Sequence, residues 1–232
     1  MLEDGLSYPV RGDWVGRIII GGLLGLFSAL ILPAFAVFGY FVRVLELTVA
    51  GDDEPPEFDD WGDLLAKGVV GVLITLAYSV VPVLLYGVFV TVVVGLGSGI
   101  GGDLGALIGF TGALLALAFI PVLFLIYYAV PAALTAYAAR GEVGAAFDVG
   151  LLKPTLLSLE YFLAVLMPIV VAILVFVLSV VLLATVVGAV LIPLVQFYGQ
   201  VAIFRMFGTA FADQSDRIEV GDGPDEPAAT PV

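Results

Sequence analysis

Four long stretches without a charged side chain constrain the fold of this chain more than any other feature. They cover residues 18–42, 68–102, 104–139 and 161–204. A helix needs about 20 apolar residues to cross a bilayer, so the first stretch predicts one span. The last stretch is long enough for two spans joined by a tight turn near residues 184–188. The stretches lack the strict alternation of barrel strands, and backbone groups in hydrocarbon must be paired, so we expect helices.

The predicted fold class is an all-α integral membrane protein, a bundle of about five transmembrane helices. We expect an N-terminal interfacial segment at residues 1–14, the bundle at 15–208, and an acidic disordered tail at 209–232. The third span is expected to bend at Pro121 or Pro131, because an interior proline removes a helix hydrogen bond. The predicted spans are approximately 15–42, 68–97, 104–139, 158–182 and 186–208.

The composition excludes several classes of function. The chain is 62% hydrophobic and has 8 basic against 21 acidic residues, so nucleic acid is not an expected partner. It contains no cysteine and no histidine, which removes thiol nucleophiles, Ser-His-Asp triads and the usual zinc ligands. No acid, lysine or arginine lies near the middle of a predicted span, where a proton relay needs one. We therefore expect no enzymatic activity, no cofactor, and no catalytic, cofactor-binding or metal-binding residue.

A short acidic segment interrupts the apolar sequence after the first span. Seven acids lie between Asp52 and Asp63, around the sequence "EPPEFDDWGDLL" at residues 54–65. Their spacing does not fit a calcium-binding loop, because Trp61 stands where an oxygen ligand is required. Either Asp59 or Asp60, just before this tryptophan, instead predicts the cap of a helix, with Asp63 in capping-box position after Asp60. The candidate interaction and turn residues here are Phe58, Asp59, Asp60 and Trp61.

A second, weaker copy of this segment suggests an internal repeat. The sequence "AAFDVGLLKP" at residues 145–154 shares Phe-Asp, a glycine and Leu-Leu with "PEFDDWGDLL" at residues 56–65. Prolines also lie at similar distances before and after each copy. Two tandem parallel two-helix repeats plus a final helix account for the pattern, and a chance match of common residues is the alternative. Phe147 and Asp148 are accordingly further candidate interaction and turn residues.

Glycines spaced four residues apart predict close contacts between helices. Gly21 and Gly25 form one such pair, and Gly101, Gly105 and Gly109 form two more. This spacing lets helix backbones approach closely. We expect packing within the chain, and association between copies of the chain is compatible with the pattern without being indicated by it.

Glu160 and Arg205 form a candidate structural ion pair. If the last two spans turn near residue 183, these two side chains lie at similar distances before and after the turn. They would then meet at the same depth, where each offsets the cost of burying the other. A structural role is favoured over a proton relay.

The distribution of lysine and arginine predicts the orientation in a cell membrane. With five spans, one side holds only Arg11 and Arg17. Cytoplasmic loops are enriched in basic residues, so we expect the N-terminus outside and the acidic loop and C-terminus in the cytoplasm. The other, basic-rich side holds Arg43, Lys67, Arg140, Lys153, Arg205 and Arg217.

Several of these motifs resemble a known family. The sequences "GYFVRVL", "FDDWGDLL", "ARGEVGAAFDVG" and "IPLVQFYGQVAIFRMFG" are similar to those of an archaeal and bacterial multi-pass membrane family catalogued as domain of unknown function 4013. The resemblance covers roughly residues 7–208. It implies a bundle of membrane helices, and it implies no activity and no catalytic residue.

The sequence favours a function based on interactions. Its most distinctive residues lie in aqueous turns, while the predicted spans carry no reactive groups. We expect a scaffold or accessory subunit that docks a cytoplasmic or membrane protein partner through its acidic Phe-Asp turns. The alternative is a transporter or channel for a small neutral or lipid-like solute, enclosed between the two predicted repeats.

Overall fold

The protein is a bundle of helices built for a membrane. The computed structural model describes residues 1–221, except for the side chains of residues 81, 98, 160, 186, 187 and 214–221. All regular elements in that part are helical, which confirms the predicted all-α class with about five spans. The helices long and apolar enough to cross a bilayer cover Ile31–Val49, Trp61–Val80, Gly102–Arg140, Tyr161–Leu183 and Gly188–Asp213.

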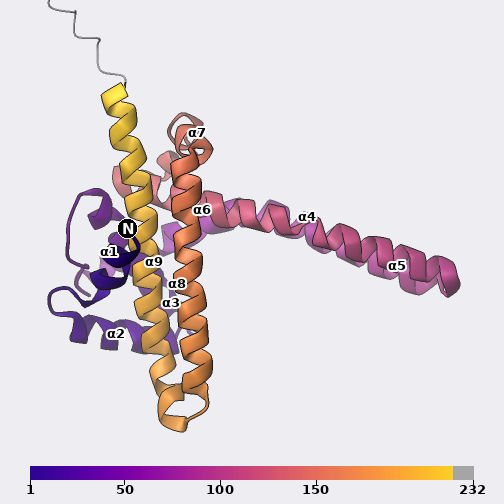
Figure 1. Ribbon diagram of the computed structural model, residues 1–232, viewed down its shortest axis with the longest axis horizontal. Helices are drawn as coiled ribbons and strands as arrows, with labels where there is room; N and C mark the ends of the chain where they lie inside the picture. The colour runs from indigo at the N-terminus through magenta and orange to yellow at the C-terminus, as the bar shows by residue number, and fades with distance from the viewer. Residues whose placement is uncertain (222–232) are drawn as a thin grey trace, which may run out of the picture.

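The last two helices form a long antiparallel hairpin that is the axis of the molecule (Figure 1). Helix α8 covers Leu159–Leu183 and α9 covers Val186–Gly221, so the turn lies at residues 184 and 185, inside the window that the sequence predicts. Helix α9 also differs from the prediction, because residues 209–221 are helical where a disordered tail is expected. Phe211 is buried in the core, which explains why the helix continues past residue 208.

The predicted single span at residues 15–42 is wrong, because this segment forms two helices. Helix α2 covers Trp14–Leu26 and α3 covers Ile31–Val49, with a turn between them. Pro33 explains the break: in a continuous helix its ring would clash with the carbonyl of Ala29, whereas proline is tolerated in the first turn of a new helix.

Helix α2 lies across α9 (Figure 1) and α3 returns along α9, so both ends of this helical pair meet the acidic loop. Gly21 of α2 packs against the ring of Phe197, and Phe41 of α3 stacks on the same ring at 5.8 Å. Near the start of α2, at the end opposite its turn into α3, Arg17 donates to the carbonyl of Pro55 at 2.6 Å. The N-terminus therefore lies at the same end of the bundle as the acidic loop, and the expectation that they lie on opposite sides is wrong.

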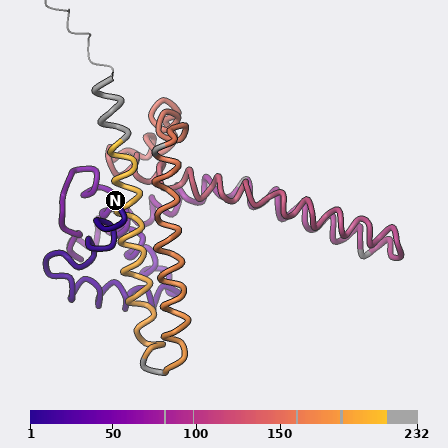
Figure 2. The backbone as a smooth tube through the Cα atoms, in the orientation of Figure 1, coloured from indigo at the N-terminus to yellow at the C-terminus, as the bar shows by residue number. Residues whose placement is uncertain are grey.

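Helices α4 and α5 form an arm. Helix α4 covers Trp61–Ile100, 40 residues, which is about 60 Å at 1.5 Å per residue and about twice the hydrocarbon thickness of a bilayer. Helix α5 covers Gly102–Leu117, and the reversal is made by Gly101 and Gly102, both at positive φ. The two helices pair and project away from the α8–α9 hairpin (Figure 2).

The third predicted span contains an interruption. Helix α5 ends at Leu117 and α6 covers Ile120–Arg140, so the chain breaks just before Pro121, one of the two prolines at which the sequence predicts a bend. Pro121 then occupies the first turn of α6, where its missing N–H leaves no helix hydrogen bond unmade. Pro131 lies inside α6.

Short elements close the loop end of the bundle. Helix α1 covers Leu2–Ser7 and is followed by the 3₁₀ turn η1 at Tyr8–Val10. A second 3₁₀ turn, η2, covers Val143–Phe147, and the short helix α7 covers Val149–Leu157.

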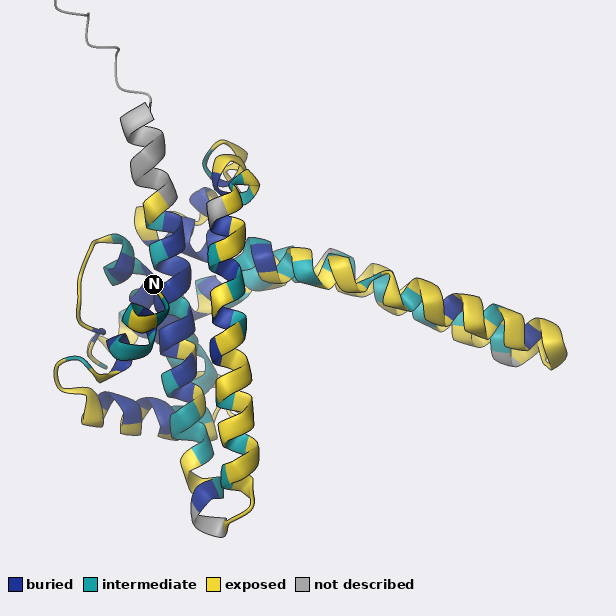
Figure 3. Ribbon diagram, in the orientation of Figure 1, coloured by how far each residue is buried: buried dark blue, intermediate teal, exposed yellow. Residues whose placement is uncertain are grey.

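The core lies where α3, α6 and α9 meet, and the rest of the apolar surface is exposed. Buried residues concentrate along α9 and its neighbours, while the arm is exposed over most of its length (Figure 3). Alanines on α6, among them Ala132 and Ala136, are fully buried against Met206 and other residues of α9. Exposed leucine and valine side chains on α4, α5 and α8 are what lipid contact requires.

Helices α3 and α4 cross with their backbones in contact. A Cβ atom placed on Gly39 would collide with the carbonyl of Leu64, and one placed on Gly68 would collide with the carbonyl of Phe35. The two clashes are reciprocal and involve main-chain atoms, which cannot rotate away. Glycine at both positions therefore sets how closely these helices approach.

We expect Gly39→Ala and Gly68→Ala each to destabilise the bundle by about 1–3 kcal/mol, because the added methyl group must push the two helices apart. The thermal midpoint of the purified protein in mild detergent measures this. Gly87→Ala in the same helix α4 is the matched control, since nothing lies within 4 Å of its added methyl group. Equal midpoints for Gly68→Ala and Gly87→Ala would contradict the close crossing.

Candidate functional site

The acidic loop after α3 is held through its main chain. Basic side chains and one tyrosine hydroxyl donate hydrogen bonds to successive backbone carbonyls between residues 52 and 60. These donors come from the N-terminal segment, α2, α3 and α9. The bonds run from Arg205 to Asp52 (2.6 Å), Arg11 to Asp53 (3.2 Å), Tyr8 to Glu54 (3.0 Å), Arg17 to Pro55 (2.6 Å) and Arg43 to Asp59 (3.1 Å).

We call this set of hydrogen bonds to the main chain of the loop the clamp. Arg205 is its central donor. It lies on α9, is 8% exposed, and pairs with the carboxylates of Asp4 at 3.1 Å and Asp53 at 3.4 Å. Its guanidinium also lies 4.6 Å from the centre of the Tyr8 ring, within the range of a cation–π contact. A buried guanidinium is costly unless its donors are satisfied, and here Arg205 joins α9, α1 and the loop.

The predicted partner of Arg205, Glu160, lies outside the described side chains. The ion pair between Glu160 and Arg205 therefore stays a prediction. The described carboxylates that contact Arg205 belong instead to the N-terminus and the acidic loop. Counting residues from the turn identified Arg205 as a paired residue but did not identify these partners.

The clamp changes the pKa values of its own groups. Burial alone would raise the pKa of the Asp4 carboxyl, but hydrogen bonds and charge from Arg11 and Arg205 hold it below its ordinary value of 3.8. Burial raises the pKa of the Tyr8 hydroxyl to about 12, although the charge of Arg205 opposes this. At neutral pH Asp4 is therefore charged and Tyr8 is a neutral donor.

A second set of ion pairs fixes the far end of the loop to α3 and α4. Arg43 on α3 pairs with Asp59 at 2.5 Å and with Asp63 at 3.0 Å. Lys67 pairs with Glu46 at 2.5 Å and with Asp63 at 3.0 Å. Asp63 thus links an arginine on one helix to a lysine on the other, next to the glycine crossing.

All four candidate residues in the loop have structural partners. Phe58 stacks on Tyr40 with ring centres 4.3 Å apart. Asp59 is paired with Arg43, and Asp60, at a φ of 40°, caps α4 by accepting from the amide of Asp63 at 3.3 Å. Trp61 stacks on Phe58 with ring centres 6.0 Å apart and is still 47% exposed.

Three acids of the loop, Asp52, Glu54 and Glu57, remain outside the ion pairs given above. All three residues are exposed, and within the described part of the chain none of their carboxylates takes part in an ion pair. No three acids among the described residues converge on a point that could hold a metal ion. The loop therefore presents free negative charge on a main chain that is held in place.

The second Phe-Asp turn repeats this plan at smaller scale. Phe147 stacks on Tyr78 with ring centres 5.5 Å apart, and the Tyr78 hydroxyl donates to the carbonyl of Ala146 at 2.6 Å. Asp148 caps α7 by accepting from the amide of Gly150 at 2.8 Å, and it pairs with Arg140 at 3.4 Å. The local roles agree, but the helix after the first turn spans the membrane and α7 does not, so the duplication stays a prediction.

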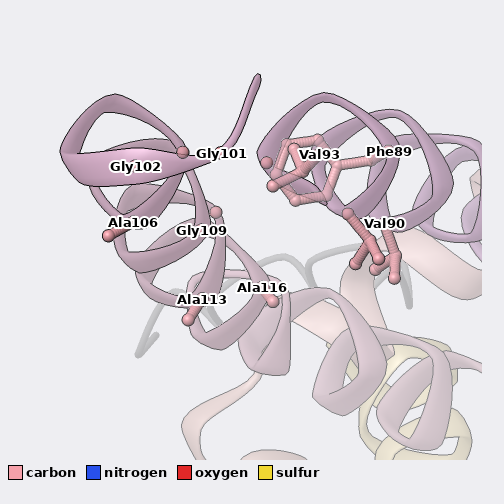
Figure 4. Close-up of a pocket in the computed structure, with 13 residues that line it drawn as sticks. Phe89, Val90, Val93, Gly101, Gly102, Ala106, Gly109, Ala113 and Ala116 are labelled. Atoms are coloured by element: carbon pink, nitrogen blue, oxygen red, sulfur yellow. The ribbon is translucent and has the colours of Figure 1, made fainter. Parts of the chain in front are cut away.

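A groove of about 520 Å³ lies between α4 and α5 near the tip of the arm (Figure 4). Phe89 and Val93 of α4 face small residues of α5, including Gly109 and Ala113. The side chains that line it are all apolar, so none of them offers a group for catalysis. Gly105 packs against the carbonyl of Gly97, so at least part of the predicted small-residue face is used within the chain.

The N-terminal residues of the clamp were not predicted from the sequence. The sequence places Arg11, Arg17 and the N-terminus on the opposite side of the membrane, because residues 15–42 contain no charge after Arg17 and predict one span. The available signal was Pro33, which favours a helix start inside that stretch.

We expect Arg205→Met to destabilise the protein by about 3 kcal/mol, because it leaves Asp4 without its buried partner and frees the carbonyl of Asp52. Limited proteolysis should then cut the loop between residues 50 and 60 much faster. Arg140→Met is the matched control: this arginine is about half exposed, and the loss of its ion pair should cost less than about 1 kcal/mol. Similar losses in both variants would show that the clamp contributes little.

Acidification should release the N-terminal segment. Because the folded pKa of Asp4 lies below 3.8, its contribution is present above that pH and is lost as the pH falls through the folded pKa. Hydrogen exchange of residues 2–7 at several pH values measures the release. Asp4→Asn should flatten this dependence and lower protection at neutral pH by about 0.5–1 kcal/mol, allowing for solvent screening. An unchanged pH profile would contradict the role of Asp4.

Comparison with known proteins places the chain in one family. The family described as "Protein of unknown function (DUF4013)" matches residues 26–184, which include both Phe-Asp turns but not the N-terminal arginines or Arg205. No curated protein and no solved structure matches the sequence. This multi-pass membrane chain therefore belongs to the DUF4013 family, as its motifs predict, and the family description assigns it no activity.

Proposed function

We propose that this protein is a non-enzymatic membrane scaffold or accessory subunit that docks a basic protein segment on its acidic loop. The observation that carries the proposal is the clamp, which uses the backbone carbonyls of the loop and leaves the carboxylates of Asp52, Glu54 and Glu57 free. A loop that served only to connect two helices would not need so many buried or half-buried donors.

Preorganisation supports docking over a purely structural role for these carboxylates. Binding usually costs free energy because a loop must be ordered when its partner arrives. Here the ordering is complete before binding, since four arginines and a tyrosine hold the main chain. Exposed Trp61 adds an aromatic side chain next to the charges, of the kind that is enriched at protein interfaces. A partner rich in lysine or arginine would complement this surface.

The distribution of basic residues supports a cytoplasmic position for the loop. Arg11 and Arg17 contact the loop itself, so the basic residues with described side chains gather at the loop end of the bundle. Their enrichment at one end is the pattern that faces the cytoplasm in most membrane proteins. The partner would then be cytoplasmic, or the cytoplasmic part of another membrane protein.

Site-specific crosslinking in native membranes tests the proposal. A photoreactive residue at Glu57 should form one discrete protein adduct, and Asp52→Asn with Glu54→Gln should reduce its yield about threefold or more. Raising the salt to about 0.5 M should act in the same direction, because exposed charges are screened.

The matched control removes two exposed acids elsewhere, with Glu3→Gln and Glu142→Gln. This pair changes the net charge equally and should leave the adduct intact. Absence of a discrete adduct at Glu57, or an equal loss in both double variants, would refute docking on the acidic loop.

A carrier of a lipid-like solute is the second candidate function. It is favoured by a largely apolar cavity of about 750 Å³ between α4, α6 and α7, large enough for part of a lipid. Carriage requires a solute to cross the membrane, whereas docking does not. Scrambling of a fluorescent phospholipid in proteoliposomes, at a rate above that of protein-free liposomes, would favour the carrier.

A further inference from the structure

A groove-like cavity lies beside α7, between α4 and α6. It is open on one side, has a volume of about 750 Å³, and is lined by Tyr78 of α4, Leu125 of α6, Phe147 of η2 and Leu152 of α7 among others. A second hollow of about 510 Å³ adjoins it and shares the side chain of Leu156 and others on the same wall. Each has a volume in the range of ligand pockets, and their lining is largely apolar.

The walls of this cavity present hydrocarbon to a ligand. The two tyrosine hydroxyls on its walls are already used: Tyr78 donates to the carbonyl of Ala146 at 2.6 Å, and Tyr128 donates to the carbonyl of Leu156 at 2.7 Å. Leu125, Leu152 and Leu156 make up much of the remaining surface. A ligand that fills the space must therefore be mostly apolar.

Lys153 provides the charge at this cavity. It lines the hollow from α7 and is exposed. Among the basic residues with described side chains, Lys153 alone has neither a carboxylate within ion-pair distance nor a hydrogen bond. The others are Arg11, Arg17, Arg43, Lys67, Arg140 and Arg205, each of which has at least one such partner. In a chain with a net charge of −13, an unpaired lysine on an apolar cavity selects an anionic group.

Helix α7 places this lysine at the surface of the bilayer. It connects two candidate membrane spans, Gly102–Arg140 and Tyr161–Leu183, and lies at the end of α8 opposite the turn at residues 184 and 185 (Figure 1). Val149 and Leu157, near its two ends, are 70% and 74% exposed. A short helix with exposed apolar residues and a lysine lies in the interface between headgroups and acyl chains.

We infer that this cavity binds one anionic phospholipid, with its phosphate on Lys153 and an acyl chain along Phe147 and Leu125. Such a phospholipid has acyl chains that match the apolar walls and a negatively charged phosphate that can pair with Lys153. Anionic lipids are abundant in cytoplasmic leaflets, where a basic residue near the surface contributes to binding. The inference does not depend on docking at the acidic loop, and either can fail without the other.

Native mass spectrometry of the full-length protein in mild detergent tests the site. Dioleoyl phosphatidylglycerol and dioleoyl phosphatidylcholine, which have the same acyl chains, are added in turn, and the bound lipid is counted. We expect one phosphatidylglycerol molecule to bind in preference to phosphatidylcholine. Lys153→Gln should weaken phosphatidylglycerol about fivefold and leave phosphatidylcholine unchanged, and Lys153→Arg should retain binding.

A second pair of variants tests the acyl chain. Ala77→Leu adds bulk to the wall of the cavity and should weaken both lipids, whereas Ala172→Leu adds the same bulk to the exposed face of α8 and should weaken neither. Lys153 and both alanines are exposed, so folding should persist, and the thermal midpoint checks this.

Three results would overturn the inference. The first is equal affinity of wild type and Lys153→Gln for phosphatidylglycerol, and the second is an equal effect of Ala77→Leu and Ala172→Leu. The third is displacement of the lipid by about 10 mM inorganic phosphate to the level of Lys153→Gln, which would assign Lys153 to free phosphate instead.

Discussion

The loop end of this protein depends on the guanidinium group of Arg205. It lies almost buried at the meeting point of α9, the N-terminal helix and the acidic loop, and it satisfies its donors with two carboxylates and one carbonyl. An unpaired cation at that depth would be strongly destabilising. The requirement to pair it therefore draws Asp4 and Asp53, which are far apart in sequence, to the same place, and the other arginines extend the clamp along the loop.

The clamp also separates two kinds of charge at the membrane surface. Most basic side chains are used internally, so the outward surface of the acidic loop carries free carboxylates, while Lys153 on α7 carries a free ammonium group. A basic protein segment fits the first surface and an anionic lipid fits the second. Both proposals follow from counting which charges already have partners in the fold, because a charge that is already paired offers little to a ligand.

Much of the architecture was predictable from the sequence, and the failures have physical causes. The tight turn after Leu183 follows from the length of the last uncharged stretch, and the cap at Asp60 follows from local chemistry. The prediction of a single span at residues 15–42 failed because the turn between Phe27 and Leu30 contains no charged residue. A count of uncharged residues cannot detect such a turn. The packing of Phe58 on Tyr40 was not predictable either, because sequence proximity to acids does not reveal which ring a phenylalanine contacts.

The sequence by itself determined that this protein resides in a lipid bilayer and that its fold is all-α. Long uncharged stretches can only be helices in a bilayer, and that constraint acts locally on each stretch. Only the tertiary structure decided which charges meet. Arg205 binds the carbonyl of Asp52 across 153 residues of sequence, and Arg17 binds that of Pro55 across 38. Such contacts depend on how α2 crosses α9 and on how closely glycines let helices approach, and no local sequence pattern encodes these features of packing.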